Sequence, residues 1–325
     1  MILQARYQWG KTEKATRDAY GEALVALGRV HPDVVVLDAD LSKSTKTALF
    51  AAEFPERFFN AGIAEQDMMA IAAGLAASGK IPFPSTFAVF AAGRAYDQVR
   101  NSICYPNLNV KIGASHAGLT VGEDGASHQM LEDIALMRVL PNMTVVVPAD
   151  ATEAAKAVPA LAARPGPAYL RLGRPAVPVL FDDDYPFEVG RAVLLREGRD
   201  VAILACGVMV ASALRAAEGL AAAGIEAAVI NVSTIKPIDQ EAVTWAARTF
   251  GALVTAEEHS VIGGLGSAVA EVVAETVPVP VARVGVRDVF GQSGKPAELL
   301  AHYGLTPNAI SQACRDVIAR RDTHR

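Results

Sequence analysis

The fold is decided by the segment RFFNAGIAEQDMMAIAAGLAASG at residues 57–79, with STFAVF at 85–90 and SHAGLTVGEDGASHQMLED at 115–133. In the first segment, Gly62 and Glu65 lie where an apolar strand gives way to an alanine-rich helix. Glu65 is the only carboxylate between Glu56 and Asp67. An acid in a first helical turn is most often explained by the helix dipole, so its meaning depends on its neighbours.

Those neighbours are aromatic and polar side chains in the two following segments. Phe87 and Phe90 provide flat apolar surface. The next segment is a glycine-containing loop with several polar groups: His116, Glu123, Asp124, His128 and Gln129. An acid, flat rings and imidazoles together suit a heteroaromatic cofactor with a ring nitrogen that must be held protonated.

The first half of the chain alternates apolar runs with alanine-rich helical patterns. Buried strands are expected at Val34–Leu37, Phe83–Phe87, Val110–Ile112, Thr144–Val147 and Ala168–Leu172. Helices are expected at Arg17–Leu27, Glu65–Ser78, Ala92–Ile103 and Ala151–Ala163, with Gly79 ending the second of them. Continuously apolar strands separated by helices predict an α/β domain with a mainly parallel sheet covered on both faces.

A second block of the same kind follows the Pro- and Asp-rich segment Pro175–Pro186. Its expected strands are Asp200–Ala205, Ala227–Val232, Leu253–Ala256 and Val281–Val284. Its expected helices lie near Val210–Ala223, Asp239–Thr249, Gly266–Glu275 and Lys295–His302. We therefore predict two domains, 1–186 and 187–325, as the length of 325 residues also suggests.

Composition excludes several classes of protein. With 51% apolar and 20% charged residues the chain can bury sizeable cores. A formal net charge of −5 and the lack of a Lys/Arg block argue against nucleic acid or an anionic membrane as a partner. The start MILQARYQ has no apolar signal-peptide core, and Val201–Leu214 is too short an apolar run to span a bilayer. Cys104, Cys206 and Cys314 are far apart and are expected to be reduced thiols, so we expect a cytoplasmic protein.

The Gly-Ile-Ala-Glu-Gln, Ser-Thr-Phe and Gly-Glu-Asp-Gly-Ala-Ser-His-Gln patterns closely resemble the pyrimidine-binding half of the transketolase family. The resemblance implies thiamine diphosphate as cofactor. Glu65 would hold the N1′ atom of the aminopyrimidine and so activate the thiazolium, while Phe87 and Phe90 would line the ring pocket. A third aromatic that transketolases usually carry nearby is displaced here by Ala92-Gly93-Arg94.

The same resemblance assigns roles to the polar loop. His128 would contact sugar hydroxyls, and Asp124 would accept a hydrogen bond from a substrate hydroxyl. Glu65, His128 and Asp124 are thus the expected catalytic set. Gln129 and Glu132 would give polar support around the cofactor.

A grip on the phosphate of a sugar phosphate is implied by matching positions elsewhere in the chain. These positions are Arg17, Ser44, His116 and Arg174. The planar guanidinium fork of arginine suits phosphate oxygens. Asp40 would lie near the thiazolium.

The second block also resembles the family, through FGQSGKPAELLAHYGLT at residues 290–306. Gly264 and Gly266 suggest a nucleotide loop, but Val269 stands where the third glycine of a dinucleotide fingerprint belongs. The resemblance implies a C-terminal domain that mainly supports assembly, without catalytic residues.

The resemblance covers nearly the whole chain but only the later part of a full transketolase. The family's diphosphate-binding domain carries a Gly-Asp-Gly followed by an Asn, and the sequence contains no Gly-Asp-Gly. No metal ligands are therefore expected in this chain. The resemblance implies a split transketolase whose partner, an N-terminal subunit, binds the diphosphate and a Mg²⁺ or Ca²⁺ ion, in an α2β2 heterotetramer with C2 symmetry.

The expected reaction of the pair is transfer of a two-carbon ketol unit from a ketose phosphate to an aldose acceptor, as in the pentose phosphate part of carbohydrate metabolism. Three alternatives remain open. A beta subunit of a 2-oxoacid dehydrogenase decarboxylase has a similar length, although that group generally has a glycine-rich loop before its histidine. A 1-deoxyxylulose-5-phosphate synthase-like enzyme would fit FGQSG but is normally a longer chain. A non-catalytic regulatory subunit would keep the fold without turnover.

Overall fold

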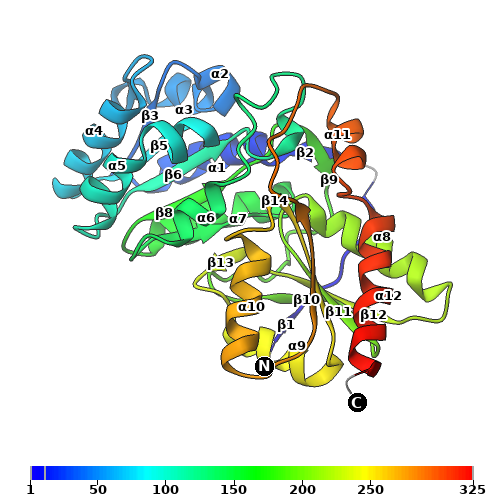
Figure 1. Cartoon of the computed structure of the whole chain (residues 1–325). Coiled ribbons are helices and arrows are strands. Elements are labelled where there is room, and N and C mark those ends of the chain that lie inside the picture. Colours follow the sequence, from blue (N-terminus) through cyan, green and yellow to red (C-terminus); the bar gives the residue numbers. More distant parts are fainter. Residues whose placement is uncertain (1, 11, 324–325) are drawn as a thin grey trace.

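The computed structural model describes residues 2–10 and 12–323, which form two α/β domains (Figure 1). Each domain is built on a mainly parallel sheet with helices on both faces. This confirms the fold class expected from the sequence.

The first domain contains a seven-stranded sheet in which all neighbouring strands but one pair are parallel. Its strand order is β13 (Thr234–Lys236), β7 (Thr144–Val146), β8 (Ala168–Arg171), β6 (Lys111–Ser115), β5 (Ile81–Phe87), β3 (Val34–Asp38) and β4 (Phe58–Asn60). Within β3, Val34 and Val36 join one apolar cluster while Val35 and Leu37 join another. The two-residue period thus fills a core on each face of the sheet.

Helices of the first domain cover both faces of the seven-stranded sheet. One face packs against α1 (Thr16–Val30), α3 (Ala48–Glu53) and α7 (Ala151–Ala163). The other packs against α4 (Glu65–Ala77) and α6 (Asp133–Arg138). Gly79 follows α4 with a φ of +88°, as its expected role at the helix end requires.

The helix expected at Ala92–Ile103 is present but is interrupted at Ala95 and is largely of the π type. The structure has π-helical turns at Phe90–Arg94 and Val99–Cys104, on either side of the short α5 (Tyr96–Gln98). The amide of Ala95 accordingly bonds to the carbonyl of Phe90, five residues back, at 3.1 Å. A π turn accommodates one extra residue per turn, which periodicity in the sequence does not reveal.

The second domain contains a six-stranded sheet. Its order is β1 (Leu3–Gln4), β10 (Val193–Arg196), β12 (Ala227–Asn231), β11 (Val201–Ala205), β14 (Leu253–Ser260) and β15 (Val281–Val286), with β10 antiparallel to β12. One face is covered by α8 (Met209–Ala221) and α12 (Pro307–Thr323), the other by α9 (Gln240–Phe250) and α10 (Leu265–Glu275). β14 is four residues longer than expected and runs through Glu257, Glu258 and His259.

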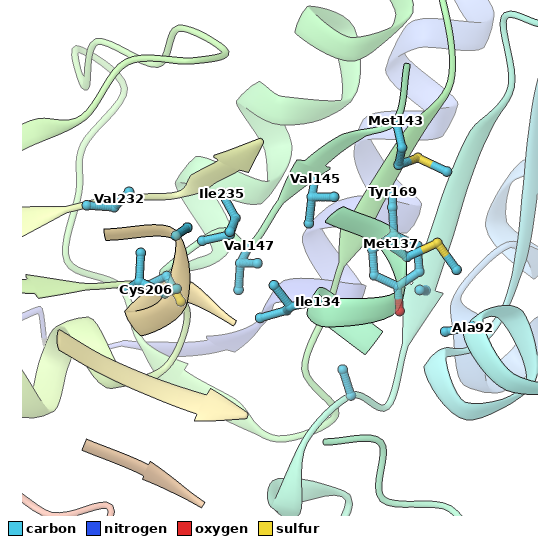
Figure 2. Packing of buried hydrophobic residues seen from close by; sticks show 14 of the residues in the cluster. Ala92, Ile134, Met137, Met143, Val145, Val147, Tyr169, Cys206, Val232 and Ile235 are labelled. Atoms are coloured by element: carbon cyan, nitrogen blue, oxygen red, sulfur yellow. The ribbon is translucent and has the colours of Figure 1, made fainter. Parts of the chain in front are cut away.

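Each sheet includes one strand from the far side of the proposed boundary. β1 pairs with β10 of the second domain, and β13 pairs with β7 of the first. We keep 1–186 and 187–325 as the proposed division. The cores are also continuous, because one cluster contains residues of both domains, as Figure 2 shows for Ile134, Val145 and Tyr169 with Cys206, Val232 and Ile235.

The elements not yet named are short. They are β2 (Glu13–Ala15) paired with β9 (Ala176–Pro178), α2 (Ser42–Thr45), α11 (Pro296–His302), and single helical turns at Pro55–Arg57 and Leu119–Val121. α12 was not expected from the sequence, because only its residues Ile310, Cys314 and Val317 are buried and its apolar pattern is weak. Across the described ranges, no helix has both the length and the apolar character needed to cross a bilayer.

Candidate active site

Four of the site residues selected from the sequence follow or end four neighbouring strands of the first sheet, at the carboxyl ends of these strands. β3 leads into Ser44, β4 into Glu65, β5 ends at Phe87, and β6 is followed by His116. In open α/β sheets, ligands bind at this edge. The fold therefore brings side chains that are up to 72 residues apart in sequence to one edge.

Glu65 is the first residue of α4 and is 2% exposed. Its Oε2 accepts a hydrogen bond from Nη1 of Arg94 at 3.1 Å. Arg94 comes from the π turn, and its guanidinium also lies over the ring of Phe90, 4.7 Å from the centroid. No role was expected for Arg94, which lies where transketolases usually carry a third aromatic, because its contact with Glu65 is not apparent from the sequence.

The two phenylalanines form a parallel pair. The ring centroids of Phe87 and Phe90 are 5.8 Å apart with an angle of 9° between the planes. His116 stacks on Phe87 at 3.8 Å, and the ring of His128 meets Phe90 edge-on at 5.8 Å. Phe87 is buried and Phe90 is half-buried, so one aromatic face borders the site.

His116 is the most constrained residue of the group. It is buried and has a φ of +55°, a conformation that few non-glycine residues adopt. Nδ1 lies 2.9 Å from Ser115 Oγ, and Nε2 lies 3.2 Å from Arg17 Nη1. Burial, reinforced by the charges of Arg17 and Arg174, lowers the pKa of His116 to about 3. The ring is therefore neutral at pH 7, and because Arg17 donates to Nε2, the proton is on Nδ1.

Arg17 also ties Ser44 to this group, since its Nη1 donates to the carbonyl of Ser44 at 2.9 Å. Burial lowers the pKa of Arg17, which remains charged at any physiological pH. Its Nε is buried and has no hydrogen-bond partner among the described residues. A buried donor without a partner fits a site that an anion completes.

Arg174 connects the cationic group to the polar loop. Its Nη1 donates to the carbonyl of Val121 and lies 3.6 Å from Asp124 Oδ2 and 3.8 Å from Glu123 Oε2. Asp124 is exposed, and His128 is half-buried with Nδ1 3.0 Å from Ser127 Oγ. The expected catalytic residues Asp124 and His128 thus face the same region as the phosphate candidates.

Three other expected residues stand apart from these contacts. The amide nitrogen of Gln129 donates to the carbonyls of Leu119, Gly122 and Gln292 at 3.3, 3.1 and 3.0 Å, so it is engaged in holding the loop. Glu132 Oε2 accepts from the amide of Leu131 at 2.9 Å. Asp40 is exposed, with a φ of +64° and its amide bonded to Asn60 Oδ1. Their roles around the cofactor remain predictions.

Asp38 is a residue that the sequence analysis missed. It is buried at the end of β3 and accepts hydrogen bonds from the hydroxyls of Thr45 and Thr47 at 2.7 and 2.9 Å. These bonds fix the turn that carries Ser44 and Asp40. Burial raises the pKa of Asp38. Across residues 2–10 and 12–323 no group of three or more His, Cys, Asp or Glu side chains could hold a metal ion.

Comparison with known proteins agrees with this geometry. Residues 12–179 match the family model "Transketolase, pyrimidine binding domain", and residues 190–310 match "Transketolase, C-terminal domain". The chain is 50% identical to a putative transketolase C-terminal section of Methanocaldococcus jannaschii, over 92% of this chain and 95% of that protein. It is 47% identical to a 6-deoxy-6-sulfo-D-fructose transketolase subunit of Clostridium sp. strain MSTE9, over 94% and 95%.

A solved structure is similar over the same length. It is described as a split gene transketolase, inactive beta4 tetramer, and superimposes with a TM-score of 0.89 at 60% identity, covering 94% of this chain and 98% of that one. Both domains and nearly the full length are matched. The chain therefore belongs to the transketolase family.

Proposed function

We propose that this chain is the C-terminal subunit of a split transketolase. With an N-terminal partner subunit it transfers a two-carbon ketol unit from a ketose phosphate to an aldose acceptor. The observation that carries this proposal is the buried carboxylate of Glu65 beside the parallel rings of Phe87 and Phe90, at the edge where His116 and His128 also lie.

Members of the family use thiamine diphosphate, and the residues present fit its aminopyrimidine ring. Glu65 would hold a proton at the ring nitrogen N1′, and Phe87 and Phe90 would pack against the ring face. When bound, the cofactor supplies the carbanion chemistry that lets a carbon–carbon bond beside a carbonyl break and form. This chain contributes orientation, a buried acid and an aromatic surface.

The substrate is proposed to bind through its phosphate and its hydroxyls. Arg17 is bonded to His116 and to the carbonyl of Ser44, and its buried Nε has no hydrogen-bond partner among the described residues, which supports an anion at this place. Arg174 would add a second positive charge to the phosphate site. His128 would contact hydroxyls near the reacting carbons, and Asp124 would accept from a hydroxyl of the sugar. The sulfonate that the name of the Clostridium relative implies is also a tetrahedral anion, so a sulfosugar donor should be compared with sugar phosphates.

The partner is proposed because no Gly-Asp-Gly occurs in the sequence and the described residues contain no metal cluster. The partner would bind the diphosphate through Mg²⁺ or Ca²⁺, in an α2β2 assembly. That the related structure is described as an inactive beta4 tetramer supports this need for a second kind of subunit. The three buried free cysteines support a cytoplasmic enzyme.

The test is reconstitution with a candidate N-terminal transketolase subunit from the same source, in the presence of thiamine diphosphate and Mg²⁺. Ketol transfer between sugar phosphates is expected, and Glu65→Gln should reduce kcat by about 100-fold or more. The matched control is Glu275→Gln, at an exposed position on α10. Undiminished transfer by Glu65→Gln would refute the assigned role. Turnover of 2-oxoacids but not sugar phosphates would favour the decarboxylase alternative, and lack of cofactor binding would favour a regulatory subunit.

A further inference from the structure

We propose that the C-terminal domain positions the polar loop of the candidate active site, and that Glu258 is the main positioning residue. This loop, residues 116–132, is called the substrate loop below because it contains His116, Asp124 and His128. The inference rests on the proposed function for its effect on turnover. It departs from the expectation that the C-terminal domain mainly supports assembly.

The end of β14 holds both ends of the substrate loop. Glu258 is 4% exposed, and its Oε1 accepts a hydrogen bond from the amide of Thr120 at 2.6 Å. Two residues further along, the amide of Ser260 donates to the carbonyl of Leu131 at 2.8 Å. A charged acceptor for a buried amide is among the stronger hydrogen bonds in proteins.

The loop backbone fits closely around the Glu258 carboxylate. Gly118 has a φ of +82°, and a Cβ atom at this position would lie 2.4 to 2.5 Å from the carboxylate atoms of Glu258. A side chain at 118 would force the hydrogen-bonded carboxylate to shift, and the positive φ would strain it as well. The approach of backbone to carboxylate therefore requires glycine at 118.

A second contact comes from the turn before α11, residues 291–293 of the FGQSG segment. Gln129 connects the substrate loop to this turn. Its side-chain amide nitrogen donates to the carbonyls of Leu119 and Gly122 in the loop and to the carbonyl of Gln292 in the turn. A Cβ at Gly291 would lie 1.8 Å from Gln129 Oε1, and one at Gly125 would lie 2.6 Å from Ser293 Oγ. The turn thus packs directly on the backbone that flanks Asp124.

Arg171 also links the substrate loop to β14 and to the first sheet. It is buried at the end of β8, and its Nη2 donates to the carbonyls of Glu258 and Met130 at 3.0 and 3.2 Å. Its Nε donates to Asp133 at 2.8 Å. The first sheet, the loop and β14 are therefore linked by one buried guanidinium.

The consequence is a division of roles between the two domains. Glu65, Phe87 and Phe90 are held by the first sheet and its helices, whereas the placement of Asp124 and His128 depends on contacts with the second domain. Loss of the Glu258 contact should leave cofactor binding intact and impair the steps that need the loop in place.

Hydrogen–deuterium exchange of the isolated chain tests the positioning without any turnover. In Glu258→Ala, amides of residues 117–131 should exchange about 10-fold faster or more, with amides of α4 and β5 unchanged. Glu258→Gln keeps an acceptor oxygen and should restore slow exchange, and Glu275→Ala is the matched control. Unchanged loop exchange in Glu258→Ala overturns the proposal. If Glu258→Ala does not fold, exchange of the Thr120 amide in the wild type is the test. Exchange of this amide as fast as in an unstructured peptide would also overturn the proposal.

The reconstituted enzyme provides the functional arm. Glu258→Ala should lower kcat/KM for the ketose phosphate about 10-fold or more, with an unchanged affinity for thiamine diphosphate and with recovery in Glu258→Gln. Unchanged kcat/KM overturns the role in catalysis. An inactive wild-type pair, combined with the expected exchange result, would count against the proposed function and leave the positioning of the loop standing.

Discussion

Arg94 Nη1 lies 3.1 Å from Glu65 Oε2, and this ion pair is the only side-chain hydrogen bond of Glu65 within the described residues. The carboxylate side chain is 2% exposed, whereas the side chain of Arg94 is 51% exposed. A half-exposed guanidinium is therefore the partner of the buried carboxylate. The proposed hydrogen bond to the cofactor's ring nitrogen requires this same carboxylate.

Replacing Arg94 should therefore lower the stability of the chain but strengthen its binding of the cofactor. In Arg94→Met, the buried carboxylate loses its partner, and the isolated chain should lose about 1 kcal/mol, since the pair is partly exposed. The reconstituted variant should bind thiamine diphosphate more tightly, because a competitor for Glu65 is gone. Urea unfolding and calorimetric titration measure the two effects, with Arg100→Met as a surface control. Weaker cofactor binding would show instead that Arg94 helps to hold the ligand.

The sequence was enough to predict the alternating strands and helices and to select Glu65, Phe87 and His116. Runs of buried aliphatic residues are a local signal, and the site residues follow strand ends that parallel pairing brings together. The ion pair of Glu65 with Arg94 was not predictable in this way. Arg94 comes from a π turn, which holds one residue more per turn than the α-helix that the sequence predicted there.

The support of the substrate loop was out of reach for a different reason. Glu258 and Thr120 are 138 residues apart, and the strand expected at Leu253–Ala256 stops before the charged residues Glu257, Glu258 and His259, which form the buried end of β14. Buried acids are stable there only because tertiary structure supplies amide donors. Glu257, for example, accepts from the amides of Leu265 and Gly266 at 2.7 and 2.8 Å. No local pattern encodes such partners.

Gly118→Ala should destabilise the chain by about 1–3 kcal/mol, because it adds a Cβ against the Glu258 carboxylate at a positive φ. Gly219→Ala is the matched control. It lies inside α8 with no atom within 4 Å of its added Cβ, and it should stabilise the chain by up to about 1 kcal/mol. Equal unfolding midpoints of the two variants in urea would contradict the close approach at Gly118.

Acid should destabilise the fold partly through His116. Its folded pKa is about 3 against an ordinary 6.5, so between these values the unfolded chain binds a proton that the folded chain does not. Stability from this residue is complete above pH 6.5 and is lost as the pH falls towards 3, by about 1.4 kcal/mol per pH unit. In His116→Asn, where asparagine tolerates the positive φ, that slope should be absent. His259, whose burial lowers its pKa to about 4, adds a slope of the same sign in both proteins.

Urea unfolding from about pH 4.5 to 6.5 measures this difference. Glu153 and Glu257, whose pKa values are raised to about 7 by burial, give slopes of the opposite sign in this range. They are unchanged in the variant, so the comparison of His116→Asn with the wild type isolates the histidine. Parallel curves would show that folding does not lower the pKa of His116.

Arg174 should select for a charged substrate. Its guanidinium lies beside the group formed by Arg17 and His116, but it also donates to the carbonyl of Val121 in the substrate loop. In the reconstituted enzyme, Arg174→Ala should lower kcat/KM for a ketose phosphate about 10- to 100-fold more than for the unphosphorylated sugar. Arg248→Ala, at an exposed position on α9, is the control. Because disturbance of the loop would affect both substrates alike, an equal loss for the two would assign Arg174 to loop support and remove it from the phosphate site.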